Sequence, residues 1–248
     1  MSKPKLAIFE FTDCEGCEVE LISLREKFLI LENRVDIVNW RLGQDNNQPG
    51  PYDIAFIEGT PITQNEIDTL KKLREESKIL IALGACACLG GIPAIIDKKD
   101  RAKWYKKIYG EKYKPRGIDA LPLNSYVKID FLIHGCPVNG NELVRIIEEL
   151  LAGKTPKYRD YSVCFECKKE NNPCRLIDKK PCLGPITQGG CNAICISNGS
   201  PCYGCFGLRK EAEVKNLLRV LNKISDKEEI NRYFTMFLNR IEGYKNVR

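Results

Sequence analysis

Short apolar runs alternate with amphipathic segments over the first 150 residues of the chain. Lys5 to Phe11 is a compact apolar run of strand length, and similar runs occupy Val35 to Trp40, Tyr52 to Glu58 and Lys78 to Leu83. Val127 to Ile133 is a fifth run of this kind. Strands that alternate with helices predict an α/β fold, with a parallel sheet covered by helices on both faces.

Apolar residues with helical spacing fill the intervals between these runs. The spacing predicts helices from about Glu18 to Leu31, from Thr63 to Glu76 and from Asn141 to Leu151. Thr63, followed three residues later by Glu66, is typical of a capping box at the start of a helix.

The pattern changes after a linker at Ala152 to Arg159. Val163 to Gly207 has little periodicity and much Gly, Pro, Asn and Cys, so it cannot bury enough apolar surface to order itself and is expected to use metal as its core. Helical spacing returns in Val214 to Leu221 and in Ile230 to Ile241. These stripes are expected to pack on the body or on a partner, and the tail is a candidate docking element for a further subunit.

Cysteine is the residue type that carries candidate chemistry. Eight of the 13 cysteines lie within 42 residues, at positions 164, 167, 174, 182, 191, 195, 202 and 205. Four others, Cys14, Cys17, Cys86 and Cys136, each follow the end of a predicted strand. Because ligands of a parallel sheet lie beyond the carboxyl ends of its strands, these four thiols are expected to converge.

Several classes of protein are disfavoured by the composition. An odd number of cysteines leaves one thiol over in a pure disulfide framework. No signal peptide is visible, which predicts a cytoplasmic chain whose cysteines bind metal, and apolar stretches such as Ile79 to Leu83 are too short to span a membrane. The net charge of +6 comes from mixed, scattered charges, which disfavours nucleic-acid binding. From the residues alone, zinc and iron–sulfur clusters fit the C-terminal cysteines equally well.

Specific motifs resemble those of nickel–iron hydrogenase small subunits. The segments 13–18, 84–91 and 135–137 resemble the proximal-cluster motifs of that family, and Ile57-Glu58-Gly59 matches a further segment. Residues 182–191 and 201–205 resemble the C-terminal part of its cytoplasmic subgroup, which includes F420-non-reducing, NAD(P)-linked and sulfur-linked enzymes. The resemblance runs from about residue 5 to 207.

The resemblance implies a domain organisation and three 4Fe–4S clusters. Residues 1–155 would form a flavodoxin-like domain with the proximal cluster, 156–207 an irregular two-cluster domain, and 208–248 a helical tail. Carried over residue by residue, the proximal ligands are Cys14, Cys17, Cys86 and Cys136. Cys86 fits the family pattern Gly-x-Cys-Ala-x-x-Gly-Gly, which leaves Cys88 as a buried small hydrophobic residue.

Order and spacing within this resemblance divide the remaining cysteines into two sets. The distal ligands would be Cys164, Cys167, Cys174 and Cys182, and the medial ligands Cys191, Cys195, Cys202 and Cys205. Cys164 stands where other family members have histidine, and Cys195 where some have proline. Clusters ligated by cysteine alone tend towards lower potentials, which suits a low-potential acceptor.

The function implied is that of an electron-transfer subunit. Its partners would be a large subunit with the nickel–iron site and a further redox subunit carrying flavin or iron–sulfur groups, without nucleic acid and without direct membrane insertion. The chain alone would have no hydrogenase activity. The alternatives are a zinc-stabilised structural or assembly protein and a single-cluster subunit like that of respiratory complex I, which has adjacent cysteines and no eight C-terminal ones.

Three other polar residues lie near the predicted strand ends. His134, the only histidine, is expected to pack or hydrogen-bond near the proximal cluster. Glu18 and Glu58 are candidates for proton relay or partner positioning, with interface hydrogen bonding or helix capping as an equally good interpretation.

Overall fold

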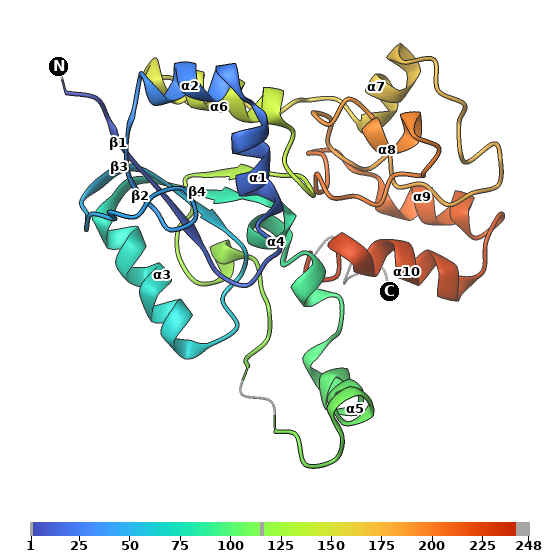
Figure 1. Cartoon of the computed structure of the whole chain (residues 1–248). Helices are drawn as coiled ribbons and strands as arrows, with labels where there is room; N and C mark the ends of the chain where they lie inside the picture. Colours follow the sequence, from blue (N-terminus) through green and yellow to red (C-terminus); the bar gives the residue numbers. More distant parts are fainter. Residues whose placement is uncertain (1, 115–116, 242–248) are drawn as a thin grey trace.

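The computed structural model describes residues 2–114 and 117–241, and its sheet is entirely parallel. The strands are β1 (Lys5–Glu10), β2 (Asp36–Trp40), β3 (Tyr52–Glu58), β4 (Ser77–Leu83) and β5 (Phe131–Ile133). Their order is β2-β1-β3-β4-β5, as in flavodoxin-like folds (Figure 1). The predicted α/β class is confirmed.

Helices surround the sheet and continue beyond it. They are α1 (Gly16–Ser23), α2 (Glu26–Glu32), α3 (Gln64–Glu76), α4 (Gly84–Leu89), α5 (Lys98–Tyr109), α6 (Gly140–Leu151), α7 (Val163–Lys169), α8 (Ile194–Ser197), α9 (Val214–Leu221) and α10 (Lys227–Phe237), with the 3-10 turns η1 (Ile92–Ala94) and η2 (Leu123–Ser125). None of the helices among the described residues is long and apolar enough to cross a membrane.

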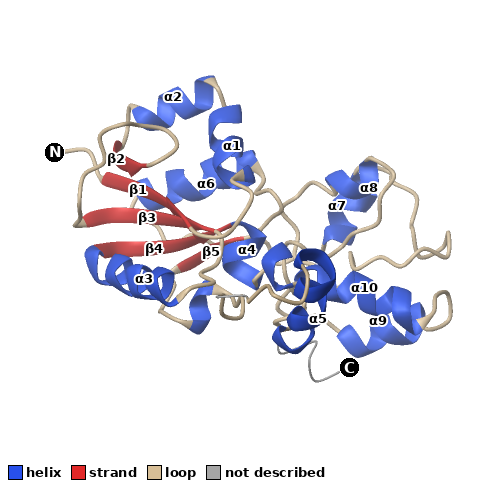
Figure 2. Cartoon of the chain, turned by 60° about the horizontal axis from the view of Figure 1, so that its bottom comes forward, coloured by secondary structure: helices blue, strands red, loops and turns tan. Residues whose placement is uncertain are grey.

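Alternate residues of the central strands enter two separate apolar cores. Ile8 and Phe56 face α1, α2 and α6, whereas Ala7, Ala55 and Leu80 face α3 and α4 (Figure 2). Both faces of the sheet are therefore buried from solvent, as expected for parallel strands. A site has room only beyond the strand ends, which is where the candidate cysteines lie.

Most predicted strands and helices of the first 150 residues lie within two residues of the observed ones, and two differ by more. The helix predicted over Glu18 to Leu31 is two helices, because Arg25 adopts a φ of 51° and interrupts it. The strand predicted from Val127 begins only at Phe131, and just before it the Asp130 carboxylate accepts the Leu80 N–H at 2.8 Å. The capping box at Thr63 is confirmed.

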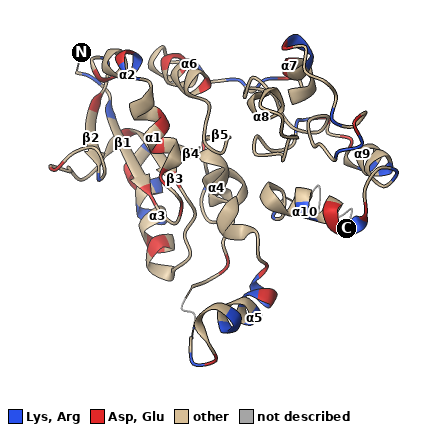
Figure 3. Ribbon diagram, turned by 45° about the vertical axis from the view of Figure 1, so that its right-hand side comes forward, with Lys and Arg blue, Asp and Glu red and all other residues tan. Residues whose placement is uncertain are grey.

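Helix α5 was not predicted and extends away from the body. The positions of its Lys and Arg residues are blue on the ribbon of Figure 3, and none of its residues is buried. Arg101, at its first turns, forms an ion pair of 3.0 Å with Asp119. The helix is therefore attached mainly at its base.

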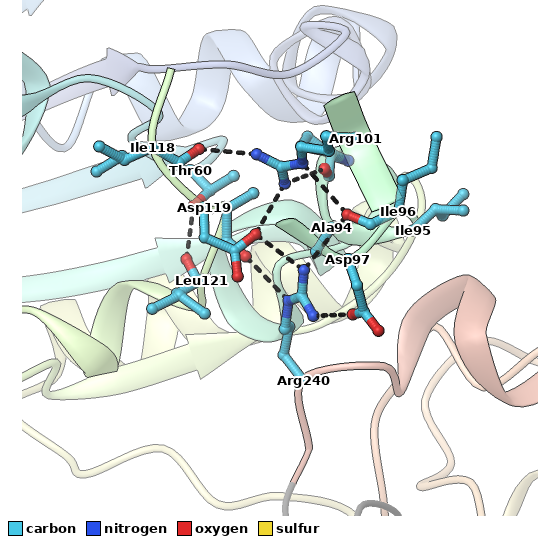
Figure 4. A network of polar contacts seen from close by, with 12 residues as sticks. Thr60, Ala94, Ile95, Ile96, Asp97, Arg101, Ile118, Asp119, Leu121 and Arg240 are labelled. Atoms are coloured by element: carbon cyan, nitrogen blue, oxygen red, sulfur yellow. Dashed lines mark hydrogen bonds and ion pairs between the residues drawn. The ribbon is translucent and has the colours of Figure 1, made fainter. Parts of the chain in front are cut away.

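The C-terminal helices join the cysteine-rich region to the sheet domain. Residues of α9 and α10 pack against Leu183 and Ile186, and Phe237 enters the core on the α3 side of the sheet. Arg240 forms ion pairs with Asp97 and, at 3.0 Å, with Asp119 (Figure 4). The predicted tail thus packs on the body. Its last residues, 242–248, lie outside the described residues.

Candidate functional site

The four N-terminal cysteines come together at the carboxyl edge of the sheet. Cys14 follows β1, Cys17 lies in the first turn of α1, Cys86 in α4 after β4, and Cys136 after β5. Burial raises the pKa of the Cys86 thiol to about 12, and the charges of Cys136 and Cys14 raise it further. Cys14 and Cys136 are exposed whereas Cys17 is buried, so the set opens to the surface on one side.

Glycines leave the space that these sulfurs occupy. A Cβ added at Gly84, where φ is +84°, would collide with Cys17 Sγ. A Cβ at Gly91, where φ is +49°, would lie 2.9 Å from Cys86 Sγ. Neither glycine can be replaced without strain, and the close approach of backbone to sulfur fits a cluster wrapped by backbone N–H groups.

Glu58 holds the loop that carries the first two cysteines. Its carboxylate accepts the N–H groups of Cys17 at 3.0 Å and Glu18 at 2.9 Å, and its side chain is almost completely buried. Burial raises the pKa of Glu58, while the bonds from Cys17 and Glu18 oppose the rise. Its contacts are therefore those of a cap on α1.

Two further carboxyl groups are buried beside this loop. Glu18 accepts the Trp40 indole N–H at 2.6 Å, and burial raises its pKa to about 7. Asp13 also has a pKa raised to about 7 by burial, and its Oδ2 is buried without a hydrogen-bond partner in the described residues. Glu18 and Glu58 therefore make internal contacts, to Trp40 and to the N–H groups at the start of α1 respectively.

The first C-terminal set gathers around α7. Cys164 and Cys167 lie on this helix, and Cys174 and Cys182 approach from the loops that follow. Burial raises the pKa of Cys164 to about 11, and the charges of Cys182, Cys167 and Cys174 add to the effect. A Cβ at Gly184 would lie 3.3 Å from Cys164 Sγ and 3.6 Å from Cys182 Sγ.

The second C-terminal set surrounds a cavity of about 330 Å³. Its cysteine lining consists of Cys136, Cys191, Cys195, Cys202 and Cys205. Much of the remaining wall is apolar, including Val163, Ile196 and Phe237. A water-poor cavity lined by thiols suits a soft, sulfur-bound metal group.

The three sets follow one another in space. The Cys202 N–H donates to Cys182 Sγ at 3.3 Å, which joins the second C-terminal set to the first. Cys136, of the sheet-edge set, lines the same cavity as Cys191, Cys195, Cys202 and Cys205. Each set is therefore next to the following one.

One buried carboxylate near the cysteines carries no sequence signal. Glu166, between Cys164 and Cys167, accepts the N–H groups of Gly190 at 2.7 Å and Ala193 at 3.3 Å. A glutamate in a short helix is ordinarily solvated. Only the fold shows that this one reaches a loop 24 residues later.

Cys88 and His134 lie behind the sheet-edge set. The Cys88 thiol is buried in the α3-side core and donates to the carbonyls of Ala82 and Ile133, both at 3.5 Å. Burial lowers the pKa of His134 to about 4, and its Nδ1 has no hydrogen-bond partner among the described residues. His134 packs near Tyr158, with ring centroids 6.2 Å apart.

Within residues 2–114 and 117–241, no three or more His, Cys, Asp or Glu side chains are grouped so as to hold a metal ion. A zinc ion draws four sulfurs to within about 2.3 Å of one point. In a four-iron cube each cysteine instead binds its own iron.

Comparisons with known proteins identify the family of this chain. Residues 14–150 match the family described as NADH ubiquinone oxidoreductase, 20 Kd subunit. The chain is 37% identical over 235 residues to the sulfhydrogenase 2 subunit delta of Pyrococcus furiosus, covering 94% of this chain and 98% of the relative. It is 32% identical to a vhu subunit of the F420-non-reducing hydrogenase of Methanocaldococcus jannaschii, covering 82% and 81% respectively.

A solved structure shares the fold. The matching chain of an NAD⁺-reducing [NiFe]-hydrogenase in the H₂-reduced state superposes with a TM-score of 0.55 at 24% identity, covering 63% of this chain and 96% of that one. The match to the Pyrococcus furiosus relative, unlike the family match, extends through the cysteine-rich region. The chain therefore belongs to the NADH ubiquinone oxidoreductase 20 Kd subunit family, as the electron-transfer small subunit of a nickel–iron hydrogenase.

Proposed function

We propose that the chain carries electrons between the nickel–iron site of a large subunit and a further redox subunit, through three 4Fe–4S clusters. The observation that carries the proposal is the succession of three cysteine sets: Cys136 of the first lines the same cavity as Cys205 of the second, and the Cys202 N–H of the second donates to Cys182 Sγ of the third. When bound, such clusters take up and release electrons. A chain of closely spaced sites is what stepwise electron transfer requires.

The residues of each set have a defined task in this proposal. Cys14, Cys17, Cys86 and Cys136 would hold the proximal cluster, at the exposed edge where a large subunit has access. Cys191, Cys195, Cys202 and Cys205 would hold the medial cluster inside the apolar cavity. Cys164, Cys167, Cys174 and Cys182 would hold the distal cluster.

The rest of the chain would support these sites. We assign residues 1–155 to a flavodoxin-like domain, 156–207 to the two-cluster domain and 208–248 to the tail. The glycines beside the sulfurs allow backbone to enclose the clusters, and the apolar walls exclude water. We place the complex in the cytoplasm, in keeping with 13 free thiols.

The test is the metal and sulfide content of the complex, purified anaerobically through a tag on this chain. About twelve iron and twelve sulfide per small subunit are expected, with nickel only where a large subunit co-purifies. About two or three zinc and no sulfide would overturn the proposal in favour of a structural zinc protein.

Matched variants distinguish ligand from neighbour. Cys86→Ser should lose proximal iron, whereas Cys88→Ser should retain about twelve iron, because a hydroxyl can also donate to the carbonyls of Ala82 and Ile133. The reverse result would exchange the roles of these two cysteines.

A further inference from the structure

Glu166 connects the two C-terminal cysteine sets. It belongs to α7, the helix that carries Cys164 and Cys167, and only 5% of its surface is exposed. Its Oε1 accepts the Gly190 N–H at 2.7 Å, and its Oε2 accepts the Ala193 N–H at 3.3 Å. Helices α7 and α8 lie side by side in Figures 1 and 2, and this carboxylate spans to the loop between them.

The same carboxylate touches the sulfur of a proposed ligand. Glu166 Oε2 lies 3.6 Å from Cys191 Sγ. A carboxylate is an unusual neighbour for a group that must become a thiolate, since like charges repel strongly where water is scarce.

No ion pair to the Glu166 carboxylate is present in the described parts of the chain. Arg159 is close enough to interact with Glu166 electrostatically, but it forms its ion pair with Glu142. The hydrogen bonds from the backbone N–H groups of Gly190 and Ala193 fix the position of the Glu166 carboxylate. A fixed negative charge beside a redox group disfavours the addition of an electron.

We propose that Glu166 is a positioning residue that holds the Cys191 loop and lowers the reduction potential of the medial cluster. The inference rests on the proposed function, because it requires that Cys191 binds a cluster. Two effects act in the same direction. The carboxylate adds negative charge near the ligand sulfur, and it engages the Gly190 N–H, which is then not free to donate to cluster sulfur.

Glu166→Gln in the complete hydrogenase complex tests the inference. Glutamine keeps the size and an oxygen that can accept from Gly190, but it removes the charge and offers an N–H to Cys191. In a redox titration followed by electron paramagnetic resonance, one of the one-electron steps should move upward while the others stay. We expect at least a tenfold increase in the reduced-to-oxidised ratio at fixed potential, equivalent to about 59 mV.

Glu170→Gln is the matched control. Glu170 is the exposed residue that follows α7, so this variant removes the same charge from the end of the same helix, at a position with no hydrogen bond to Cys191 among the described residues. Its titration should coincide with that of the wild type. Iron and sulfide content should be unchanged in both variants.

Three outcomes would count against the two proposals in different ways. Equal titrations for the two variants, with full iron content, would overturn the role of the Glu166 charge. Loss of iron from Glu166→Gln alone would overturn the inference in favour of a purely structural carboxylate. A wild-type complex with far fewer than about twelve iron atoms per small subunit would instead overturn the proposed function on which the inference rests.

Discussion

The sheet-edge cysteines and the C-terminal cysteines are mounted on two different kinds of support. Behind the first set, strands β1, β3 and β4 are buried on both faces by aliphatic and aromatic side chains. Around the C-terminal cysteines, the buried cluster consists of Val163, Cys167, Cys182, Ala193, Ile196 and Cys202. Half of that small core is cysteine. One region is thus a scaffold that carries the candidate ligands, and in the other the candidate ligands themselves make up much of the core.

The largest expected effect follows from removing iron. Anaerobic chelation should leave the sheet folded, because its core contains no ligand other than Cys17. Residues 163–207 should lose their protected amides, since structural metal sites contribute on the order of 10 kcal/mol to folding. Hydrogen exchange measured by mass spectrometry checks this segment by segment.

The same experiment contains its own control. Peptides from β3 and β4 should exchange equally in the iron-loaded and iron-free chains. If the sheet and the cysteine-rich region lose protection together, the two supports are one cooperative unit and the contrast between them is wrong.

The next largest effect is expected for the stability of the sheet domain, when a side chain of its core is shortened. Phe56 is fully buried in β3, and Phe56→Ala should lower the free energy of unfolding by about 3–5 kcal/mol. Ile177, in the cysteine-rich region, is 80% exposed, so Ile177→Ala should change stability by less than about 0.5 kcal/mol. Urea midpoints from far-ultraviolet circular dichroism compare the two. A large loss of stability in Ile177→Ala would show that apolar burial also stabilises the cysteine-rich region, contrary to the comparison made above.

An intermediate loss of stability is expected at Glu58, which joins the end of β3 to the start of α1. Glu58→Gln keeps one acceptor for the N–H groups of Cys17 and Glu18 but loses the charge that strengthens both bonds. A loss of about 1.5–3 kcal/mol is expected, with faster exchange in α1 and unchanged exchange in residues 163–207. Glu26→Gln, at an exposed position on α2, is the control and should behave as wild type.

The same contrast explains which features could be predicted from the sequence. The scaffold is built from local patterns, so β3 was predicted with its observed boundaries and Thr63 as a cap. The interruption at Arg25 was missed because apolar spacing continues across it. Glu166 could not be found at all, since its partners are brought to it only by the folding of the cysteine-rich loop.

The smallest effect concerns an ion pair in the scaffold. Asp53, in β3, binds Lys78 Nζ at 2.7 Å and accepts the Lys5 N–H at 2.8 Å, so it ties together three neighbouring strands. The hydrogen bond from Lys78, followed by that from Lys5, lowers the pKa of Asp53. Its contribution is therefore present above the unfolded pKa of about 3.9 and is lost as pH falls through the lower folded value.

Asp53→Asn should accordingly cost about 0.5–1 kcal/mol at neutral pH, as partly exposed pairs do. The difference from wild type should disappear in acid, below the folded pKa of Asp53. Urea unfolding of the iron-free chain at both pH values measures this without interference from cluster loss. Asp36→Asn, at an exposed position of β2, should match wild type throughout. A loss comparable to that of Phe56→Ala would mean that charge, and not apolar burial, holds the strands that carry the first set of cysteines.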